Sequence, residues 1–323
     1  MDKTQSHLLI IQPQLEKVRD LIGDSLADPD RRLGPLLDHI SLTRGKMLRP
    51  ALVLLSGKCF ADITDKHISV AAIVELIHIT TLLHDDVIDQ SAIRRGKPSI
   101  NDLYDNKTAI LAGDFVFSKA FELCASVENT AISNLLASTT NSLCRGEIRQ
   151  NLTQNDYTIT EDEYLGIISE KSASLFGSCC RVGAMISNAD ENSCDALKQF
   201  GSNLGIAFQI IDDILDVAGS PDTTGKPLAG DIKNSIPTLP VIYLMQLSSP
   251  KKHDDLIRQF TDPDISTDQK IMLLTANGVI KQAREKAAWY ISQAVGHLDT
   301  VNQSPAKTAL SEIAKSFLNI EIN

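Results

Sequence analysis

The chain lacks the features that would place it in several large classes of protein. Of its 323 residues, 31 are Lys or Arg and 41 are Asp or Glu, so the formal net charge is −10. A protein that binds nucleic acid needs a basic face, and acidity also disfavours binding to anionic membranes. The six cysteines form no CxxC pair, so neither a zinc knuckle nor a redox motif is indicated. Buried thiols in a reducing cytosol are the simpler interpretation.

Long apolar segments are scarce too. The amino-terminal sequence has no signal-peptide core, because Gln12 and Pro13 interrupt its apolar stretch. No run approaches the roughly 18 apolar residues that a membrane span requires. We therefore expect a cytoplasmic protein without a transmembrane segment.

Strand-like alternation, low-complexity tracts, short repeats and flexible linkers are also missing. What the sequence does contain is helical periodicity, with Gly and Pro clustered between the helical segments. The predicted helices span residues 51–58, 68–84, 114–127, 131–150, 161–188, 194–218 and 268–298. Thr160 and Glu163 form a capping-box pattern at the start of one of them. Residues 220–231 and 247–255 are predicted loops. We predict one all-α domain over residues 1–323, a large helical bundle around a central apolar cavity.

Two aspartate-rich motifs follow apolar stretches, "HDDVID" at residues 84–89 and "IDDILD" at residues 211–216. Residues i and i+4 share a helix face, so Asp85 projects with Asp89, and Asp212 projects with Asp216. Asp86 and Asp213 lie about 100° away on their helices. Two such sites from distant helices could converge at one end of a bundle.

A carboxylate pair at this spacing repels itself unless a cation lies between its members. Hard oxygen ligands favour Mg²⁺, which keeps several waters and accepts phosphate oxygens from a substrate. One such motif alone could be a solvated acidic helix end. Two of them, each after an apolar segment and near basic residues, favour a metal site. An EF-hand is a poor alternative, because neither motif has the alternating Asp ladder that ends in Gly.

An ordered series of short motifs between about Arg44 and Pro240 resembles the trans-isoprenyl diphosphate synthases, or polyprenyl synthetases, of the medium- to long-chain type. The motifs are GKMLRP (45–50), LLHDDVID (82–89) followed by an arginine pair and Gly96, LAGDF (111–115), GEIRQ (146–150), KSA (171–173), FQIIDDILD (208–216) and GKP (225–227). A lone DDxxD motif is weak evidence, whereas this ordered set is very specific.

The resemblance implies an all-α, usually dimeric enzyme that condenses isopentenyl diphosphate head-to-tail with an allylic prenyl diphosphate. Two or three Mg²⁺ ions would bind the allylic diphosphate to Asp85, Asp89 and Asp212, with Asp216 helping. Its phosphates would also contact Arg94, Lys171 and Lys226. Isopentenyl diphosphate would contact Lys46, Arg49, His78 and Arg95, and the reacting carbons would contact Ser172 and Gln209.

The reaction suits these residue types. Breaking the allylic C–O bond leaves a highly charged diphosphate, which metal ions, lysines and arginines neutralise. The allylic cation needs nearby dipoles, and the Gln209 amide oxygen and the Ser172 hydroxyl could supply them. The departing diphosphate can itself remove the final proton. Simpler interpretations exist for single residues: Lys46 and Arg49 as charges at a helix start, and His78 as a core histidine. His78 nevertheless lies two turns before Asp85, on the same face.

The sequence departs from the family pattern in residues 231–238, "DIKNSIPT". Ser235 and Ile236 stand where the family commonly has Gly-Lys, so one phosphate-side lysine is missing. Lys233 could replace it, and we interpret the change as tuning rather than inactivation. Ser172 stands where threonine is common, which preserves the hydroxyl.

Product length depends on the apolar helix that precedes Asp85. Short-chain members of the family resemble one another in having an aromatic floor about five residues before the first aspartate. Here Thr80 and Thr81 are small, and Ile77 and Val74 follow one and two turns deeper without a ring. Residues 118–121 and 135–143 are candidates for a deeper floor. We expect a hexaprenyl to decaprenyl product suited to a quinone side chain, with geranylgeranyl or farnesyl diphosphate as the shorter alternatives.

Two other functions are weighed against this one. A class I terpene cyclase has no site for a second diphosphate, and Lys46, Arg49 and Arg95 argue against it. A non-catalytic regulatory subunit of a heteromeric synthase would not need intact aspartates in both motifs. The sequence leaves open the preferred allylic primer and the choice between homodimer and heterodimer.

Overall fold

A computed structural model describes residues 7–42, 45–219, 228–247 and 250–319. Helices dominate these residues, and the only strands among them form a two-residue hairpin, β1 (Ile93–Arg94) and β2 (Lys97–Pro98). The helices are α2 (Gln12–Leu26), α3 (Gly34–Leu42), α4 (Leu48–Lys58), α5 (Asp65–Ile88), α6 (Ile100–Leu103), α7 (Asn106–Ser126), α8 (Thr130–Leu152), α9 (Glu161–Ile168), α10 (Ser174–Ile186), α11 (Glu191–Ala218), α13 (Gly230–Lys233), α14 (Leu239–Gln246), α15 (Pro250–Thr261), α16 (Thr267–Ala276), α17 (Val279–His297) and α18 (Pro305–Ser316). Short turns of other helix types are η1 (Leu9–Ile11), η2 (Ser169–Ala173), η3 (Leu298–Thr300) and η4 (Phe317–Asn319). The predicted all-α fold is confirmed.

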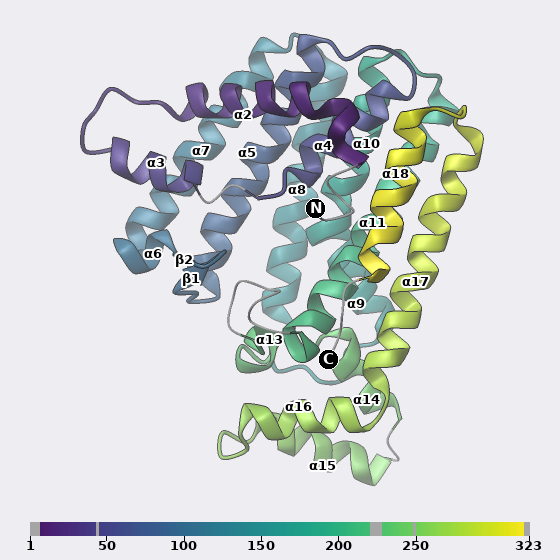
Figure 1. The fold of residues 1–323 in the computed structure, drawn as a ribbon. Coiled ribbons are helices and arrows are strands. Elements are labelled where there is room, and N and C mark those ends of the chain that lie inside the picture. The colour runs from purple at the N-terminus through teal and green to yellow at the C-terminus, as the bar shows by residue number, and fades with distance from the viewer. Residues whose placement is uncertain (1–6, 43–44, 220–227, 248–249, 320–323) are drawn as a thin grey trace.

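The long helices stand side by side, as Figure 1 shows, with α2 across the upper end and α15 and α16 below the lower end. Helix α5 packs on α4 and α7, while α10 packs on α4, α8 and α11. Helix α17 covers α11 from the other side. The two helices that carry the aspartate motifs therefore belong to the same bundle.

Helix α5 is the most apolar long element. It is long and apolar enough to cross a membrane by length and composition, but 72% of its apolar window is buried in the fold, as in a core helix. Most of its residues between Ile68 and Thr80 are buried, because neighbouring helices pack on more than one side. One glutamate, Glu75, lies in this apolar stretch and is only 2% exposed.

Several predicted boundaries were wrong. The segment 161–188 is interrupted by η2, a π-helical turn. The segment 268–298 divides into α16 and α17, because Gly278 adopts a left-handed conformation with φ of 71°. The predicted loop at 247–255 contains the start of α15. Helices α2, α3, α6, α14 and α18 were not predicted, nor was α13, which begins inside the predicted loop 220–231. The capping box of Thr160 and Glu163 is present as expected.

Candidate active site

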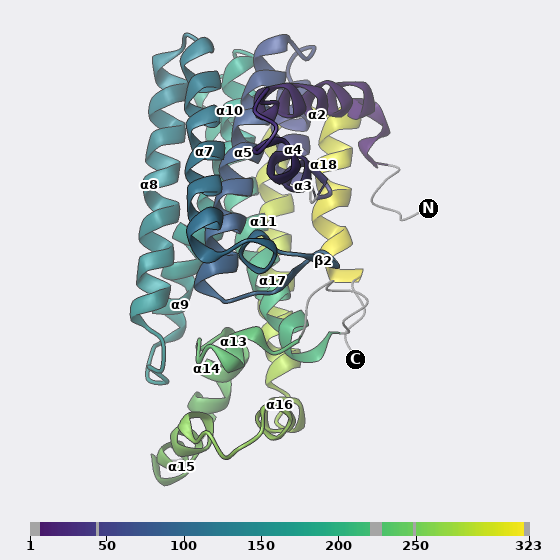
Figure 2. The ribbon, with the colours of Figure 1, turned by 90° about the vertical axis from the view of Figure 1, so that its left-hand side faces the viewer.

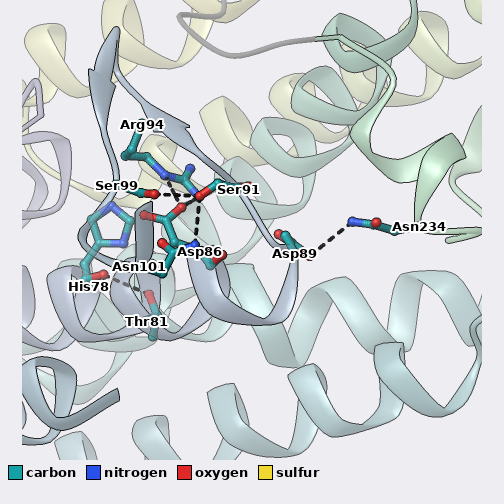
Figure 3. Close-up of polar contacts among 9 residues, drawn as sticks. All are labelled: His78, Thr81, Asp86, Asp89, Ser91, Arg94, Ser99, Asn101 and Asn234. Atoms are coloured by element: carbon teal, nitrogen blue, oxygen red, sulfur yellow. Dashed lines mark hydrogen bonds and ion pairs between the residues drawn. The ribbon is translucent and has the colours of Figure 1, made fainter. Parts of the chain in front are cut away.

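The first aspartate motif closes α5. Asp85 and Asp86 lie in its last turn, and Asp89 caps its C-terminus. Asp86 is 4% exposed and accepts hydrogen bonds from Nε and Nη2 of Arg94 at 2.8 and 2.5 Å (Figure 3). Burial lowers the pKa of Arg94, but the hydrogen bond and charge of Asp86 outweigh it, so the pKa is raised. Asp86 therefore positions Arg94, which the sequence had assigned only to phosphate.

The arginine pair belongs to a tight hairpin. Arg94 pairs with Lys97, and the two residues between them, Arg95 and Gly96, both have positive φ, 53° and 73°. Such two-residue turns match the twist of antiparallel strands. A left-handed conformation is common for Gly but strained for Arg. The hairpin turn therefore holds Arg95 in a strained backbone conformation, which sets the direction of its side chain.

The base of this hairpin is tied to the end of α5. Ser99 Oγ donates to the carbonyl oxygen of Ser91 at 2.6 Å, and Asn101 Nδ2 donates to the same oxygen at 3.1 Å (Figure 3). Asn101 Nδ2 also contacts the carbonyl oxygen of Asp86 at 3.3 Å. The hairpin and the aspartate motif are therefore one rigid unit.

The surroundings of Asp85 disfavour its negative charge. Burial raises its pKa from the usual 3.8 to about 7, and the charges of Glu147 and Asp89 add to this, while Lys171 and Arg94 oppose it. A carboxylate in this setting is stabilised either by a proton or by another cation. The donor set of Asp85 and Asp89 therefore fits a divalent metal ion.

Lys171 comes from the π-helical turn η2. Its Nζ forms an ion pair with Glu147 at 2.8 Å and a hydrogen bond with Gln150 Oε1, both on α8. A Cβ on Gly146 would lie 2.3 Å from the backbone nitrogen of Lys171, so only glycine allows α8 to approach the turn this closely. The glycine of the GEIRQ motif thus places Lys171 where its charge acts on Asp85 and Asp89.

The second aspartate motif lies near the end of α11. Asp216 is 2% exposed, and its two carboxylate oxygens accept the backbone N–H groups of Gly230 and Asp231 at 3.1 and 3.0 Å. It therefore caps the short helix α13, a role that the sequence had not predicted. Asn234, which follows α13, donates from Nδ2 to Asp89 Oδ1 at 3.5 Å (Figure 3). Helix α13 thus joins the two motifs at one end of the bundle.

The departure from the family pattern has a local explanation. Ser235 has a φ of 54°, in the left-handed region that glycine adopts with less strain. Its carbonyl oxygen accepts a hydrogen bond from the backbone of Asn155 at 2.9 Å. Lys233 is exposed and donates to the carbonyl oxygen of Leu228 at 3.4 Å, so in this structure it does not replace the missing lysine.

A chain of four side chains lies beside the second motif. Ser172 Oγ donates to Gln209 Oε1 at 2.5 Å, Gln209 Nε2 donates to Asp213 Oδ1 at 2.9 Å, and the Tyr164 hydroxyl donates to Asp213 Oδ2 at 2.7 Å. Burial raises the pKa of Asp213 to about 7, and the hydrogen bonds from Tyr164 and Gln209 oppose the rise. Asp213 therefore belongs to a buried hydrogen-bond network. Asp212 is half-buried on the same helix.

Arg49 of the GKMLRP motif lies close to Glu75 of α5. The Arg49 guanidinium stacks 4.8 Å from the centre of the Phe176 ring, and its Nε is buried without a hydrogen-bond partner among the described residues. Burial lowers the pKa of Arg49, and the charge of Glu75 is the largest opposing influence. Burial also lowers the pKa of Arg95, and the charge of Glu75 is again the largest opposing influence. Sequence reasoning missed Glu75, although a single acid in the apolar stretch "AAIVELIHITT" was a signal.

The charges of Arg49 and Arg95 act on His78, which Figure 3 shows beside Asp86 and Arg94. Its pKa is well below the usual 6.5, first because of burial and then because of the charges of Arg49, Arg95 and Arg94. His78 is therefore a neutral imidazole near pH 7, able to donate one hydrogen bond but not to supply charge. Lys46 is exposed, and Lys226 lies outside the described residues.

The residues expected to set product length all lie on α5. Thr80 is buried and donates from Oγ1 to the carbonyl oxygen of Gly113 on α7 at 3.4 Å. Thr81 donates to the carbonyl oxygen of His78 at 2.8 Å (Figure 3). Ile77 and Val74 belong to the hydrophobic core. Thr80 thus faces α7, and an added ring there would enter the α5–α7 contact.

No three His, Cys, Asp or Glu side chains within the described ranges gather closely enough to hold a metal ion by themselves. A cation at the aspartates would therefore need further oxygen ligands, which water or a diphosphate can supply.

Comparison with known proteins gives consistent matches over nearly the whole chain. The family model for polyprenyl synthetase matches residues 30–275. Solanesyl-diphosphate synthase 2, chloroplastic, of Oryza sativa subsp. japonica is 36% identical, covering 96% of this chain and 78% of that protein. A polyprenyl synthase from Caulobacter crescentus CB15, crystallised with calcium and isoprenyl diphosphate, superposes with a TM-score of 0.93 at 29% identity and covers 98% of both chains. The structure of geranylgeranyl pyrophosphate synthetase from Pyrococcus horikoshii Ot3 superposes with a TM-score of 0.89 at 32% identity, covering 99% of this chain and 100% of that one.

Proposed function

Because the chain belongs to the polyprenyl synthetase family, we propose that it condenses an allylic prenyl diphosphate head-to-tail with successive isopentenyl diphosphates to give a long-chain all-trans polyprenyl diphosphate. The observation that carries this proposal is the meeting of the two aspartate motifs through α13, with Asp216 on one side and Asp89 on the other. Cationic side chains surround the first of these motifs.

The allylic diphosphate binds on the aspartate side. Asp85, Asp89 and Asp212 would hold Mg²⁺, which would supply positive charge to the departing diphosphate. The calcium and isoprenyl diphosphate bound to the Caulobacter relative support a divalent ion at such a site. Lys171 and Arg94 contact the phosphates directly, Lys171 from η2 and Arg94 from the hairpin. Lys226 is proposed for the same task.

Isopentenyl diphosphate binds on the side of the GKMLRP motif. Arg49 and Arg95 provide charge that is already partly removed from water, so little reorganisation is needed when an anion arrives. The unpartnered Nε of Arg49 is one donor available to that anion. Lys46 adds a flexible cation at the rim, and the neutral His78 contributes a hydrogen bond.

The allylic cation forms between these two sites. The Gln209 amide oxygen and the Ser172 hydroxyl oxygen face it as dipoles, and neither is a strong enough nucleophile to trap it. The isopentenyl double bond attacks the cation to form the new C–C bond. The departed diphosphate then takes the proton from the carbon next to the new cation, which completes the double bond.

The product is proposed to be long, in the hexaprenyl to decaprenyl range used for quinone side chains. Small side chains at Thr80 and Thr81 leave the turns of α5 just before Asp85 without an aromatic floor. The solanesyl relative is 36% identical to this chain and the geranylgeranyl one 32%. Geranylgeranyl diphosphate remains the shorter alternative.

We also propose a homodimer. The outer faces of α7 and α8 expose large apolar side chains, namely Ile110, Leu111, Phe121, Ile148 and Leu152. Along α8 the exposed positions are otherwise small or uncharged apart from Arg145. Figure 2 shows α7 and α8 on the same side of the bundle. A second copy would cover such a face symmetrically.

The six thiols form no disulfide, which supports a reducing, cytoplasmic location.

One incubation tests the proposed reaction. Purified protein is mixed with Mg²⁺, farnesyl diphosphate and labelled isopentenyl diphosphate, and the products are separated by chain length. A ladder of linear prenyl diphosphates supports the proposal. Cyclic hydrocarbon would show a terpene cyclase instead, and the absence of any product would indicate a regulatory subunit.

A further inference from the structure

The amide of Gln209 can present either of its ends to the reacting carbons. Rotation by 180° exchanges its oxygen and its NH₂ group with almost no change in shape, so the hydrogen-bond partners decide the orientation. The oxygen carries partial negative charge and stabilises an allylic cation, whereas the NH₂ group carries partial positive charge and opposes it. The orientation therefore affects the rate of ionisation.

Ser172 cannot fix this orientation alone. Its hydroxyl lies 2.5 Å from Gln209 Oε1, but a hydroxyl can donate or accept and would suit either end of the amide. The Asp213 carboxylate, when ionised, accepts only, and its Oδ1 lies 2.9 Å from Gln209 Nε2. Asp213 is thus the partner that requires the NH₂ group on its own side.

Asp213 is itself held in place. It is 4% exposed and one turn after Gln209 on α11, between Asp212 and Asp216 in the sequence. Its second oxygen accepts the hydroxyl of Tyr164, a residue of α9 that is also 4% exposed, at 2.7 Å. Burial keeps the pKa of Tyr164 well above 10, so the hydroxyl remains a donor. This contact keeps the Asp213 carboxylate turned toward Gln209.

We propose that Asp213 and Tyr164 are positioning residues that hold the Gln209 amide with its oxygen toward the allylic cation. The inference rests on the proposed function and assigns Asp213, in the middle of an aspartate motif, to the hydrocarbon rather than to the metal. When the amide turns over, the cation forms more slowly, and more of it is captured by water to give prenyl alcohol and a proton.

Three variants test this proposal in the full-length enzyme. Asp213→Asn introduces a group that donates as well as accepts, so both amide orientations become available. Tyr164→Phe frees the carboxylate and keeps the ring. Tyr243→Phe is the matched control, because Tyr243 is equally buried but its hydroxyl bonds to Glu161. The readouts are kcat, KM for isopentenyl diphosphate, the Mg²⁺ concentration for half-maximal rate, the fraction of prenyl alcohol, and Tm.

We expect Asp213→Asn to lower kcat roughly tenfold or more, as expected for one oriented dipole, and Tyr164→Phe to lower it less. Both should raise the alcohol fraction with little change in KM or in the Mg²⁺ requirement. In a Gln209→Ala background, Asp213→Asn should have almost no further effect, because the residue acts through Gln209.

An equal loss of kcat from Asp213→Asn with and without Gln209 would overturn the proposal, as would a raised Mg²⁺ requirement with an unchanged alcohol fraction. Failure of Asp213→Asn to fold leaves Tyr164→Phe to decide by the same readouts. A wild-type enzyme that makes no prenyl diphosphate would overturn the proposed function itself, whereas an active wild type with unaffected variants would overturn only the positioning role.

Discussion

The guanidinium of Arg95 lies directly against Gly45, so that a Cβ on this glycine would come within 2.4 Å of Arg95 Nη2. The first residue of the GKMLRP motif and the second arginine of the hairpin are 50 positions apart in sequence, yet they share one small space. The glycine therefore leaves room for the guanidinium of Arg95, which is proposed to contact isopentenyl diphosphate.

Gly45→Ala should weaken isopentenyl diphosphate binding. The added methyl group displaces the flexible guanidinium rather than the backbone, so we expect KM for isopentenyl diphosphate to rise roughly tenfold, about 1.4 kcal/mol, while Tm and KM for the allylic substrate change little. Steady-state kinetics with each substrate varied in turn would measure this. Gly296→Ala is the control, because nothing lies within 4 Å of a Cβ at that site. Equal increases in both KM values would contradict the assignment.

Asp85→Asn should stabilise the metal-free protein in a pH-dependent way. Its folded-state pKa of about 7 exceeds the usual 3.8, so between these values the folded protein keeps a proton that the unfolded chain has lost. Wild-type stability therefore falls as pH rises through this range, and asparagine removes that loss. We expect Tm of the variant to exceed that of the wild type by a few degrees at pH 8, and by less at pH 5.

Thermal unfolding at both pH values measures this difference, with and without Mg²⁺ and inorganic pyrophosphate. The added ligands should raise Tm of the wild type at pH 8 and not that of the Asp85→Asn variant. The same substitution at the exposed Asp20 on α2 should change neither quantity. A Tm gain that is the same at both pH values would argue that Asp85 is not strained by burial.

Thr80→Phe should shorten the product. A ring at this buried position enters the space between α5 and α7 and closes the path that the growing chain is proposed to follow. We expect the longest product to fall to about geranylgeranyl length, since each added isoprene unit then meets a wall instead of apolar contacts. Chromatography of the labelled products measures the change. Thr275→Phe, on the exposed face of α16, is the control. Unchanged lengths would refute this path along α5.

Charges on the outer faces of α7 and α8 should separate the proposed dimer. Phe121 and Ile148 are 59% and 60% exposed, and a double change to glutamate places repelling charges where a second copy would bury them. Light scattering after gel filtration should give the mass of two chains for the wild type and of one for the variant. Met272→Glu, on α16 and equally exposed at 63%, should leave the mass unchanged. A monomeric wild type would contradict the dimer.

The sequence predicted what local patterns encode. Helical periodicity located most of the long helices, and the i, i+4 spacing identified Asp85 with Asp89 as one pair. The sequence pattern could not assign roles to Asp86 and Asp213, because tertiary contacts bring their partners to them. Arg94, in a hairpin turn, is the partner of Asp86, and Tyr164, on another helix, is the partner of Asp213. The role of Asp216 in capping α13 was missed for the same reason.

Backbone conformation was equally hidden from pattern reading. The left-handed Arg95 and the π-helical turn at 169–173 have no distinctive composition. Their conformations are held by tertiary packing, which offsets the strain and which a sequence pattern does not reveal. Glu75 was the exception, because one acidic residue inside an apolar stretch is visible in the sequence alone.

The π-helical turn that carries Lys171 and Ser172 constrains insertions and deletions more than substitutions. Removing one residue from 169–173 would let the turn close into an ordinary α-helix, so the wider spacing that the π-helical turn gives to Lys171 and Ser172 would be lost. Lys171 and Ser172 could then no longer reach the phosphate and the hydrocarbon of one bound molecule, as proposed for them above. Among homologues, alignment gaps should therefore be absent from these five positions even where their side chains differ.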